Sequence, residues 1–305
     1  MSELQTLIDA VGLGALYALM AVGIALVFGV MRLVNFAYGQ LIMFGAYALA
    51  FTDDLPEGVS ILICFAVVIA LSLLMERVAF RPLRRASAAT MLAATFAISF
   101  LLQSIALVRY SFANKPIGDI ATVLSGLNKA VTIGSLHIRW VTIVAIIVGA
   151  VTLACMALLL NRTSIGLQMR ASATDFQTAR LLGVKADTVI AFAFFLSGIL
   201  AATVAVIFVV QAPLVRPDFG LRETIIVLVG VVVGGIDRLW SATLGGFAIG
   251  FATGALGGFL PSTGAWPFTS GVYKDSAIFA LVILVLLLRP SGLFAPPGRS
   301  AVERV

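Results

Sequence analysis

The side chains that most often carry enzyme chemistry are scarce in this sequence of 305 residues. It has one histidine, His137, and two cysteines, Cys64 and Cys155, which both lie inside apolar runs. There is no Cys/His cluster typical of a transition-metal site, and no G-x-x-x-x-G-K-[ST] loop that would bind the phosphates of ATP. The apolar runs also lack a Ser-His-Asp set or a pair of carboxylates. The sequence therefore predicts no catalytic site, no metal and no cofactor, and any ATP that drives the protein must be bound by another polypeptide.

Polar and charged side chains are concentrated in residues 168–187, QMRASATDFQTARLLGVKAD, between two charge-free runs of more than twenty residues each. Ser172 and Asp175 have the spacing of an N-terminal capping box, and Gly183 suits the left-handed position that follows a helix. We therefore expect a helix of about ten residues over 173–182, which is too short to cross a bilayer. An amphipathic segment of this kind is either an ordinary membrane-surface helix or a docking site for a soluble partner.

Polar residues or glycines interrupt the apolar runs at two further places. One carries Asn35, Tyr38, Gly39 and Gln40, and the other carries Gly234 and Gly235. Broken hydrophobic segments in both halves of a transporter can mark the substrate path, because freed backbone groups and helix ends can face a solute. These six residues are the candidate translocation path, and the alternative is a tight turn at the cytoplasmic surface.

Glycine recurs at four-residue steps at Gly246, Gly250, Gly254 and Gly258. On a helix these positions form one smooth stripe, and small residues let helices approach closely in lipid. The stripe predicts tight packing within the bundle, and the alternatives are a wall of the conduit or a subunit interface.

The elements that position these residues are apolar runs. The chain is 61% hydrophobic and 11% charged, with a mean hydropathy of +1.12, whereas soluble domains are about 25% charged. We expect an all-α polytopic membrane protein with about eight or nine transmembrane helices. The nine apolar segments are residues 7–31, 36–52, 58–75, 88–108, 140–160, 188–210, 223–236, 241–260 and 275–288. The second and seventh are short for a span, and a tilted, broken or re-entrant helix would account for either of them.

Charge in the loops predicts the orientation of the spans. Residues 77–87 hold four arginines and residues 161–187 are also basic, whereas the loop 52–57 carries only acidic charges. The positive-inside rule then places the N-terminus outside and the C-terminus in the cytoplasm. Residues 161–187 become a cytoplasmic loop, and residues 109–139 become the largest external loop, where we expect a small hairpin or a surface helix. The net charge of +6 follows from these basic loops and does not indicate nucleic-acid binding.

Ionisable side chains are missing from the cores of the apolar segments, with Glu76, Arg109 and Glu223 at their ends. Carriers coupled to ions or protons usually need such a group within the membrane. The sequence therefore argues against a pump or an antiporter and favours a neutral or zwitterionic solute with apolar bulk.

Residues 177–183, QTARLLG, resemble a degenerate form of the E-A-A-x-x-x-G loop of ABC importer permeases. Ala179 and Gly183 match that loop, while Gln177 and Thr178 replace its Glu and Ala. Other stretches follow the order and spacing of one family: GALYALMAVGIALVFGVMRLVNFAYGQLIMFGAY (14–47), ERVAFRPLR (76–84), VVVGGIDRLWSATLGG (231–246) and LLLRPSGLF (286–294). Over nearly all of its length the chain resembles the shorter permease subunit of the branched-chain amino acid ABC importers. The resemblance implies one transmembrane permease domain, residues 1–305, with the ABC importer permease fold.

The resemblance also implies a system of several parts in the bacterial inner membrane. A second permease subunit would pair with this chain, two ATP-binding cassette subunits would dock from the cytoplasm, and an extracytoplasmic solute-binding protein would deliver a small-molecule substrate. Coupling to the ATPase would fall to the polar segment, with Arg170, Asp175, Gln177, Ala179, Arg180 and Gly183 as the candidate residues.

Three departures from the family leave the cargo open. The family often has His and an acid at the positions of Tyr38 and Gln40, and usually Gly at that of Ser241. Branched-chain amino acids are the leading hypothesis for the cargo, with urea or a short amide as the alternative within the family. A facilitator that works without ATP is the alternative from another class.

Overall fold

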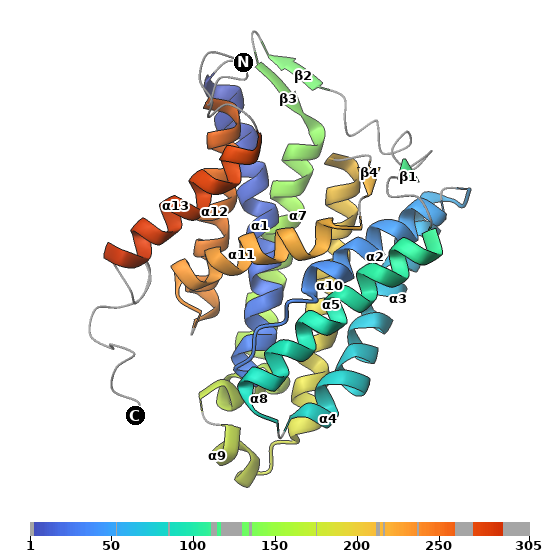
Figure 1. The fold of residues 1–305 in the computed structure, drawn as a ribbon, viewed down its shortest axis with the longest axis vertical. Coiled ribbons are helices and arrows are strands. Elements are labelled where there is room, and N and C mark those ends of the chain that lie inside the picture. The colour runs from blue at the N-terminus through green and yellow to red at the C-terminus, as the bar shows by residue number, and fades with distance from the viewer. Residues whose placement is uncertain are drawn as a thin grey trace.

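The computed structural model describes residues 3–52, 54–84, 86–110, 115–116, 130–133, 136–174, 176–211, 214–215, 217–236, 238–259 and 271–288. Helices dominate this part of the chain (Figure 1). The apolar helices are α1 (Glu3–Met31), α2 (Tyr38–Phe51), α3 (Glu57–Met75), α5 (Ala88–Tyr110), α7 (Trp140–Arg162), α10 (Ala186–Gln211), α11 (Phe219–Gly234), α12 (Leu239–Phe259) and α13 (Gly271–Leu288). The π-helix η1 (Glu76–Phe80) and α4 (Arg81–Leu83) continue α3, while α8 (Ser164–Thr174) and α9 (Phe176–Leu181) connect α7 to α10.

Within these ranges, each of the nine predicted apolar segments overlaps one of the helices, although most bounds differ by a few residues, which confirms the all-α polytopic architecture. Six helices of the described chain are long and apolar enough to cross a membrane: α1, α3 with its continuation, α5, α7, α10 and α12. The second and seventh segments, predicted to be short, form α2 with 14 residues and α11 with 16. At 1.5 Å per residue both are shorter than the roughly 30 Å hydrocarbon core of a bilayer.

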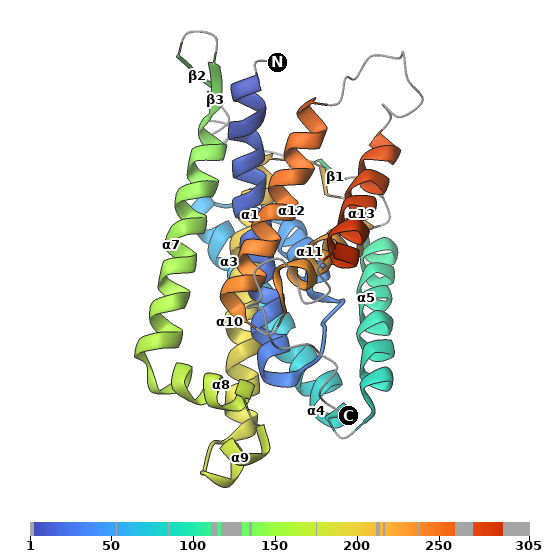
Figure 2. The same ribbon diagram turned by 90° about the vertical axis from the view of Figure 1, so that its left-hand side faces the viewer.

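α1 and α10 form the centre of the bundle (Figures 1 and 2). α1 packs along α12, α10 and α7, and α10 also packs against α3 and α2. Their side chains are apolar and buried, as at Met20 and Leu200, which are fully buried. By contrast α3 and α7 expose leucines such as Leu62 and Leu158. Helices that are apolar on all sides belong in the core, and exposed leucines on the outer helices suit contact with lipid.

The glycine stripe of α12 lies against α1. A Cβ atom on Gly246, Gly250 or Gly254 would lie 2.4, 2.8 or 2.6 Å from an atom of α1. Non-bonded carbon atoms prefer separations of about 3.5–4.0 Å, so a side chain at these positions would force the two helices apart. Gly258 lies further along α12, and its surroundings fall outside the described residues.

Two short strand pairs lie in the half of the bundle where α1 begins, with β2 (Ala130–Ile133) and β3 (Leu136–Arg139) at its very end (Figures 1 and 2). β2 and β3 pair antiparallel, so of the two forms expected within residues 109–139 the hairpin is found. β1 (Lys115–Pro116) pairs antiparallel with β4 (Leu214–Val215). α4, α8 and α9 lie at the opposite end. The hairpin and the polar segment are therefore separated by the full length of the apolar bundle.

Candidate functional site

The first interruption predicted from the sequence precedes α2. Residues 32–37 are not helical and lead from the end of α1 back to the middle of the bundle, where α2 begins (Figure 1). The Oδ1 atom of Asn35 accepts a hydrogen bond from the backbone N–H of Ala37 at 3.0 Å, and its carbonyl accepts one from Tyr38 at 3.3 Å. Asn35 therefore forms a turn that starts a helix inside the bundle. Irregular backbone at this depth is tolerated where protein or a solute path surrounds it.

α2 and α11 meet near their N-terminal ends. A Cβ atom on Gly39 would lie 1.9 Å from the carbonyl oxygen of Gly220, so only glycine fits at this contact. The backbone N–H of Gly39 donates to Oγ1 of Thr224 at 2.8 Å, and this hydroxyl donates to the carbonyl of Gly220 at 2.6 Å. Because an N–H in the first turn of a helix has no partner within its own helix, Thr224 supplies one and anchors α2 on α11.

Three polar side chains near this contact are buried with incomplete hydrogen bonding. Tyr38 and Gln40 are fully buried and Asn35 is 1% exposed. The Nε2 atom of Gln40 donates to Oγ of Ser99 on α5 at 3.2 Å. Among the described residues, Nδ2 of Asn35, the hydroxyl of Tyr38 and Oε1 of Gln40 have no hydrogen-bond partner. A buried polar atom in this condition costs roughly 1–3 kcal/mol, which suits a site whose bonding is completed by a solute or by a change of conformation.

The second interruption lies at the other end of α11. Gly235 has φ +108°, and its N–H donates to the carbonyl of Val231 at 3.0 Å. A Cβ atom on Gly234 would lie 2.2 Å from the carbonyl oxygen of Ser241 in α12. The two glycines form the tight turn between α11 and α12, about 21 Å along α11 from Gly220. The structure thus gathers Asn35, Tyr38, Gly39 and Gln40 at the start of α11 and leaves Gly234 and Gly235 apart from them.

The expectation that no ionisable side chain lies within the apolar core was wrong at Glu223. Glu223 is the fifth residue of α11, and its Oε2 atom accepts a hydrogen bond from the hydroxyl of Tyr17 at 2.5 Å. Tyr17 is the middle residue of α1, which has 29 residues. Glu223 does lie near the end of an apolar segment along the chain. However, α11 begins inside the bundle, so that end is at mid-depth (Figure 1).

The polar segment at the opposite end also differs from the prediction. The helix expected over 173–182 is replaced by α8 and α9. The side chain of Thr163, not of Ser172, caps the first of them, because its Oγ1 accepts a hydrogen bond from the N–H of Gly166 at 3.1 Å. Ser172 lies buried inside α8, so the predicted capping box was wrong. Asp175, its other member, lies outside the described residues.

The turn that follows α9 contains Gly183, which has φ +92° and confirms the predicted left-handed residue. The N–H of Gly183 donates to the carbonyl of Arg180, and the N–H of Val184 donates to that of Ala179, both at 3.1 Å. These two bonds define a Schellman motif. A Cβ atom on Gly183 would meet nothing within 4 Å, so the backbone conformation alone favours glycine.

This end of α9 presents apolar and basic side chains outward. Leu181 and Leu182 are 88% and 81% exposed, and Arg180 is exposed beside them. Ala179 is buried. Gln177 lies in α9, with its side chain outside the described part. We call Arg180, Leu181 and Leu182 the α9 tip.

Two arginines attach α8 to the long helices. Arg170 donates to Oδ1 of Asn161, near the end of α7, at 2.7 Å. Arg32, directly after α1, donates to the carbonyl of Ala173 at 2.6 Å. A displacement of α8 would therefore act on both α7 and α1.

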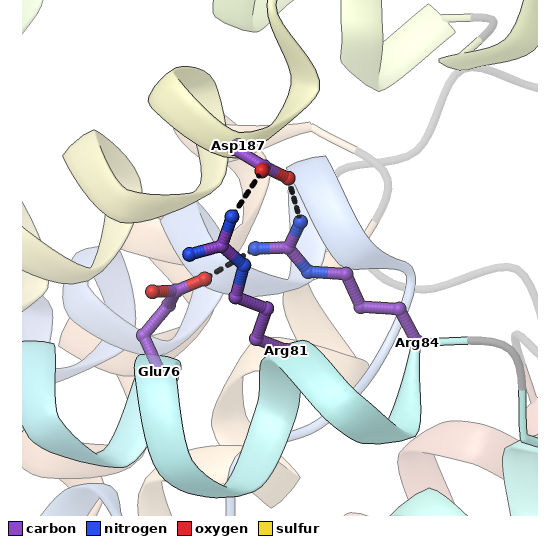
Figure 3. Close-up of polar contacts among 4 residues, drawn as sticks. All are labelled: Glu76, Arg81, Arg84 and Asp187. Carbon is purple, nitrogen blue, oxygen red and sulfur yellow. Dashed lines mark hydrogen bonds and ion pairs between the residues drawn. The ribbon is translucent and has the colours of Figure 1, made fainter.

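Four charged side chains connect the start of α10 to η1 and α4 (Figure 3). Arg81 pairs with Asp187 at 2.6 Å, and Arg84 bridges Asp187 and Glu76. The side chains of Arg84 and Glu76 are 19% and 8% exposed, whereas those of Arg81 and Asp187 are 47% and 58% exposed. From the sequence these residues were recognised only as charges in loops or at the ends of apolar segments. Their pairing could not be read from the chain, because Arg84 and Asp187 are 103 residues apart. This charged network ties the residues that follow α9 to the end of α3.

The family described as branched-chain amino acid transport system / permease component matches residues 6–288. The chain belongs to this family. Its predicted resemblance is thereby confirmed, and the apolar helices are those of a multi-pass inner-membrane permease.

This permease is similar to two curated relatives over nearly their full lengths. It is 31% identical to the high-affinity branched-chain amino acid transport system permease protein BraD of Pseudomonas aeruginosa, over 99% of this chain and 98% of that protein. It is 30% identical to the corresponding protein LivH of Escherichia coli K12, over 99% and 97%. Among solved structures, one described as a metal-chelate type ABC transporter in an inward-facing conformation has a TM-score of 0.51 at 18% identity, covering 94% of this permease and 87% of that chain. That likeness supports the ABC transporter permease fold.

Proposed function

We propose that this permease is the transmembrane subunit of an ABC importer that carries branched-chain amino acids, with ATP hydrolysed by separate subunits. The observation that carries the proposal is the match, over 99% of the chain, to permeases named for high-affinity branched-chain amino acid transport. This match over nearly the full chain supports a single permease domain over residues 1–305. In this function the chain performs no covalent chemistry of its own.

The translocation path runs past the contact between α2 and α11. The helix break before α2 and the buried polar atoms of Asn35, Tyr38 and Gln40 support this position. Gly39 keeps the two helices close enough for these groups to act together. Gly234 and Gly235 serve the α11–α12 turn instead, and the glycines of α12 serve packing against α1.

The end of the bundle with α8 and α9 faces the cytoplasm and receives one ATPase subunit. The basic loops at this end support that orientation, with the N-terminus and residues 109–139 outside and the C-terminus inside. The α9 tip is the contact surface, since its two leucines are exposed and α9 lies at one end of the bundle (Figure 1). Arg170, Ala179 and Gly183 shape and hold this coupling segment, and Asp175 and Gln177 remain candidate coupling residues within it. Motion of α9 reaches the spans through α8, through Arg32 and through the charged network.

The complete importer would contain a second permease subunit, two ATP-binding cassette subunits and an extracytoplasmic solute-binding protein. This composition rests on the family to which the permease belongs. The binding protein selects and delivers the amino acid, so the permease needs to recognise it only in transit.

The experiment is uptake of radiolabelled leucine by proteoliposomes that contain the complex purified with its co-encoded partners, with the binding protein outside and ATP inside. We expect uptake that depends on ATP and on the binding protein. Uptake of labelled urea but not of leucine would show that the cargo is urea or a short amide. Leucine flux through the permease alone, without ATP, would show that the protein is a facilitator and not an importer subunit.

Coupling is tested in the same system by the double substitution Leu181→Asp with Leu182→Asp. Burying a leucine in an interface contributes about 1.5–3 kcal/mol, so loss of both should reduce uptake and co-purification of the ATPase by more than about tenfold. Leu55→Asp is the matched control, because Leu55 is an exposed leucine in the loop between α2 and α3, away from α9. Normal ATPase binding by the double variant would remove the α9 tip from the docking surface.

A further inference from the structure

The carboxylate of Glu223 is a charged group at mid-depth in the permease. The Tyr17 hydroxyl that donates to it at 2.5 Å comes from the middle of α1. Tyr17 is 5% exposed, whereas Glu223 is only partly buried. By the rise of a helix, about 21 Å of α1 extends from Tyr17 toward each end of the bundle. Glu223 is therefore far from either surface, and a charge at this depth marks a functional site by default because it is costly there.

Glu223 also lies directly beside the contact that anchors α2. The Oγ1 atom of its neighbour Thr224 accepts a hydrogen bond from the N–H of Gly39 at 2.8 Å. One turn earlier, a Cβ atom on Gly220 would lie only 2.8 Å from Gln40. The carboxylate and the buried polar groups of α2 thus share the start of α11. One place in the bundle combines a negative charge, an amide and hydroxyl groups.

We propose that Glu223 binds the ammonium group of the amino acid as it passes through the permease. This inference rests on the proposed function and names the chemical feature of the substrate that the permease reads. A carboxylate has two oxygens and about four lone-pair sites, so it can accept from Tyr17 and from further donors at the same time. Hydrogen bonds to an ionised group are roughly twice as strong as neutral ones. Urea and other neutral amides lack the positive charge that such a site would select.

Tyr17 is a positioning residue in this arrangement. Its hydroxyl donates to one carboxylate oxygen and fixes the rotamer of Glu223 without neutralising its charge. The competing explanation is a brace, in which the pair only holds α11 against α1. Two substitutions distinguish substrate binding from bracing, because each removes only one of the two interactions. Glu223→Gln removes the charge but retains an oxygen that can accept from Tyr17, whereas Tyr17→Phe removes the hydrogen bond and retains the charge.

The test measures leucine imported per ATP hydrolysed by the complete complex in proteoliposomes, together with the thermal unfolding temperature of each variant. Glu57→Gln is the matched control, since it removes an exposed carboxylate at the start of α3. We expect Glu223→Gln to lower the ratio by roughly 10- to 100-fold, the value of a hydrogen-bonded charge. Tyr17→Phe should lower it by a smaller factor, and Glu57→Gln should match the wild type.

A ratio for Glu223→Gln equal to that of the wild type would overturn the inference. A larger loss in Tyr17→Phe than in Glu223→Gln, accompanied by a lower unfolding temperature, would overturn it in favour of the brace. In both cases leucine import by the wild-type complex would leave the proposed function intact. If the wild-type complex itself imported no leucine, the proposed function would fail first, and the assignment of Glu223 with it.

Discussion

Replacing Gly39 with alanine tests the contact between α2 and α11 more sharply than any other single change. The new Cβ atom would lie 1.9 Å from the carbonyl oxygen of Gly220 and 2.3 Å from Oγ1 of Thr224. Non-bonded atoms of this kind need more than about 3 Å, so the helices must separate by more than about 1 Å. The nearest obstacle is a backbone carbonyl, which cannot rotate away as a side chain could.

The expected change in the free energy of unfolding is the sum of three contributions. Overpacking of this kind typically costs about 1–3 kcal/mol. Separation of the helices also breaks the hydrogen bond from Gly39 to Thr224, which is 2.8 Å long, at a cost of about 1 kcal/mol. Alanine within a helix recovers roughly 0.5–1 kcal/mol relative to glycine. The free energy of unfolding should therefore fall by about 1–3 kcal/mol.

A matched glycine-to-alanine substitution in α1 should change the free energy of unfolding in the opposite direction. Gly29 lies in α1, and a Cβ atom there would meet nothing within 4 Å. Gly29→Ala should therefore be neutral or stabilise the permease by up to about 1 kcal/mol. The assay is thermal unfolding of the purified complex in detergent, followed by ATP-driven leucine uptake. A Gly39→Ala variant that unfolds at or above the temperature of Gly29→Ala would refute the close contact, and unimpaired uptake would refute its place on the path.

Two further predictions concern the other end of the bundle. Arg84→Gln should lower the free energy of unfolding by about 1–3 kcal/mol, because the side chain of Glu76 is 8% exposed and loses its ion pair. Arg81→Gln should lower it by less than about 1 kcal/mol, because the pair of Arg81 with Asp187 is largely exposed. Equal unfolding temperatures for the two variants would contradict the proposed role of the charged network. Gly183→Val places a β-branched residue at φ +92°, where a Cβ atom meets no neighbour. The backbone strain costs about 1–2 kcal/mol locally, so leucine uptake should fall while membrane insertion persists. Gly183→Asn is the control and should retain more uptake, because Asn tolerates a left-handed φ. Wild-type uptake by Gly183→Val would show that the turn after α9 does not transmit motion.

Local patterns in the chain were sufficient for the helices and for their class. Each apolar run became a helix, because a buried or lipid-facing backbone must satisfy its own hydrogen bonds and an apolar run of this length has few other ways to do so. The left-handed Gly183 and the hairpin over β2 and β3 were equally local, since each depends on neighbouring residues only. The stripe at Gly246, Gly250 and Gly254 was readable because helical period alone brings these positions to one face.

The cap of the polar segment shows where local patterns stop. Thr163 and Ser172 are both suitable capping residues, and the chain alone does not say which one starts the helix. The contacts of α8 with α1, α7 and α10 bury Ser172 and leave Thr163 exposed at the end of α7. Packing, not propensity, selected the earlier start.

The amino-acid sequence by itself determined that this protein is a helical membrane permease, because hydropathy, charge bias and family resemblance all lie along the chain. Only the tertiary structure decided the depth of each polar group. α2 and α11 are too short to span, so their position across the membrane depends on the helices that surround them. For that reason Glu223, at the end of an apolar run, came to lie beside the middle of α1. The packing of α10 against α3 and η1 likewise brings Arg84 next to Asp187, although the two are 103 positions apart in the chain.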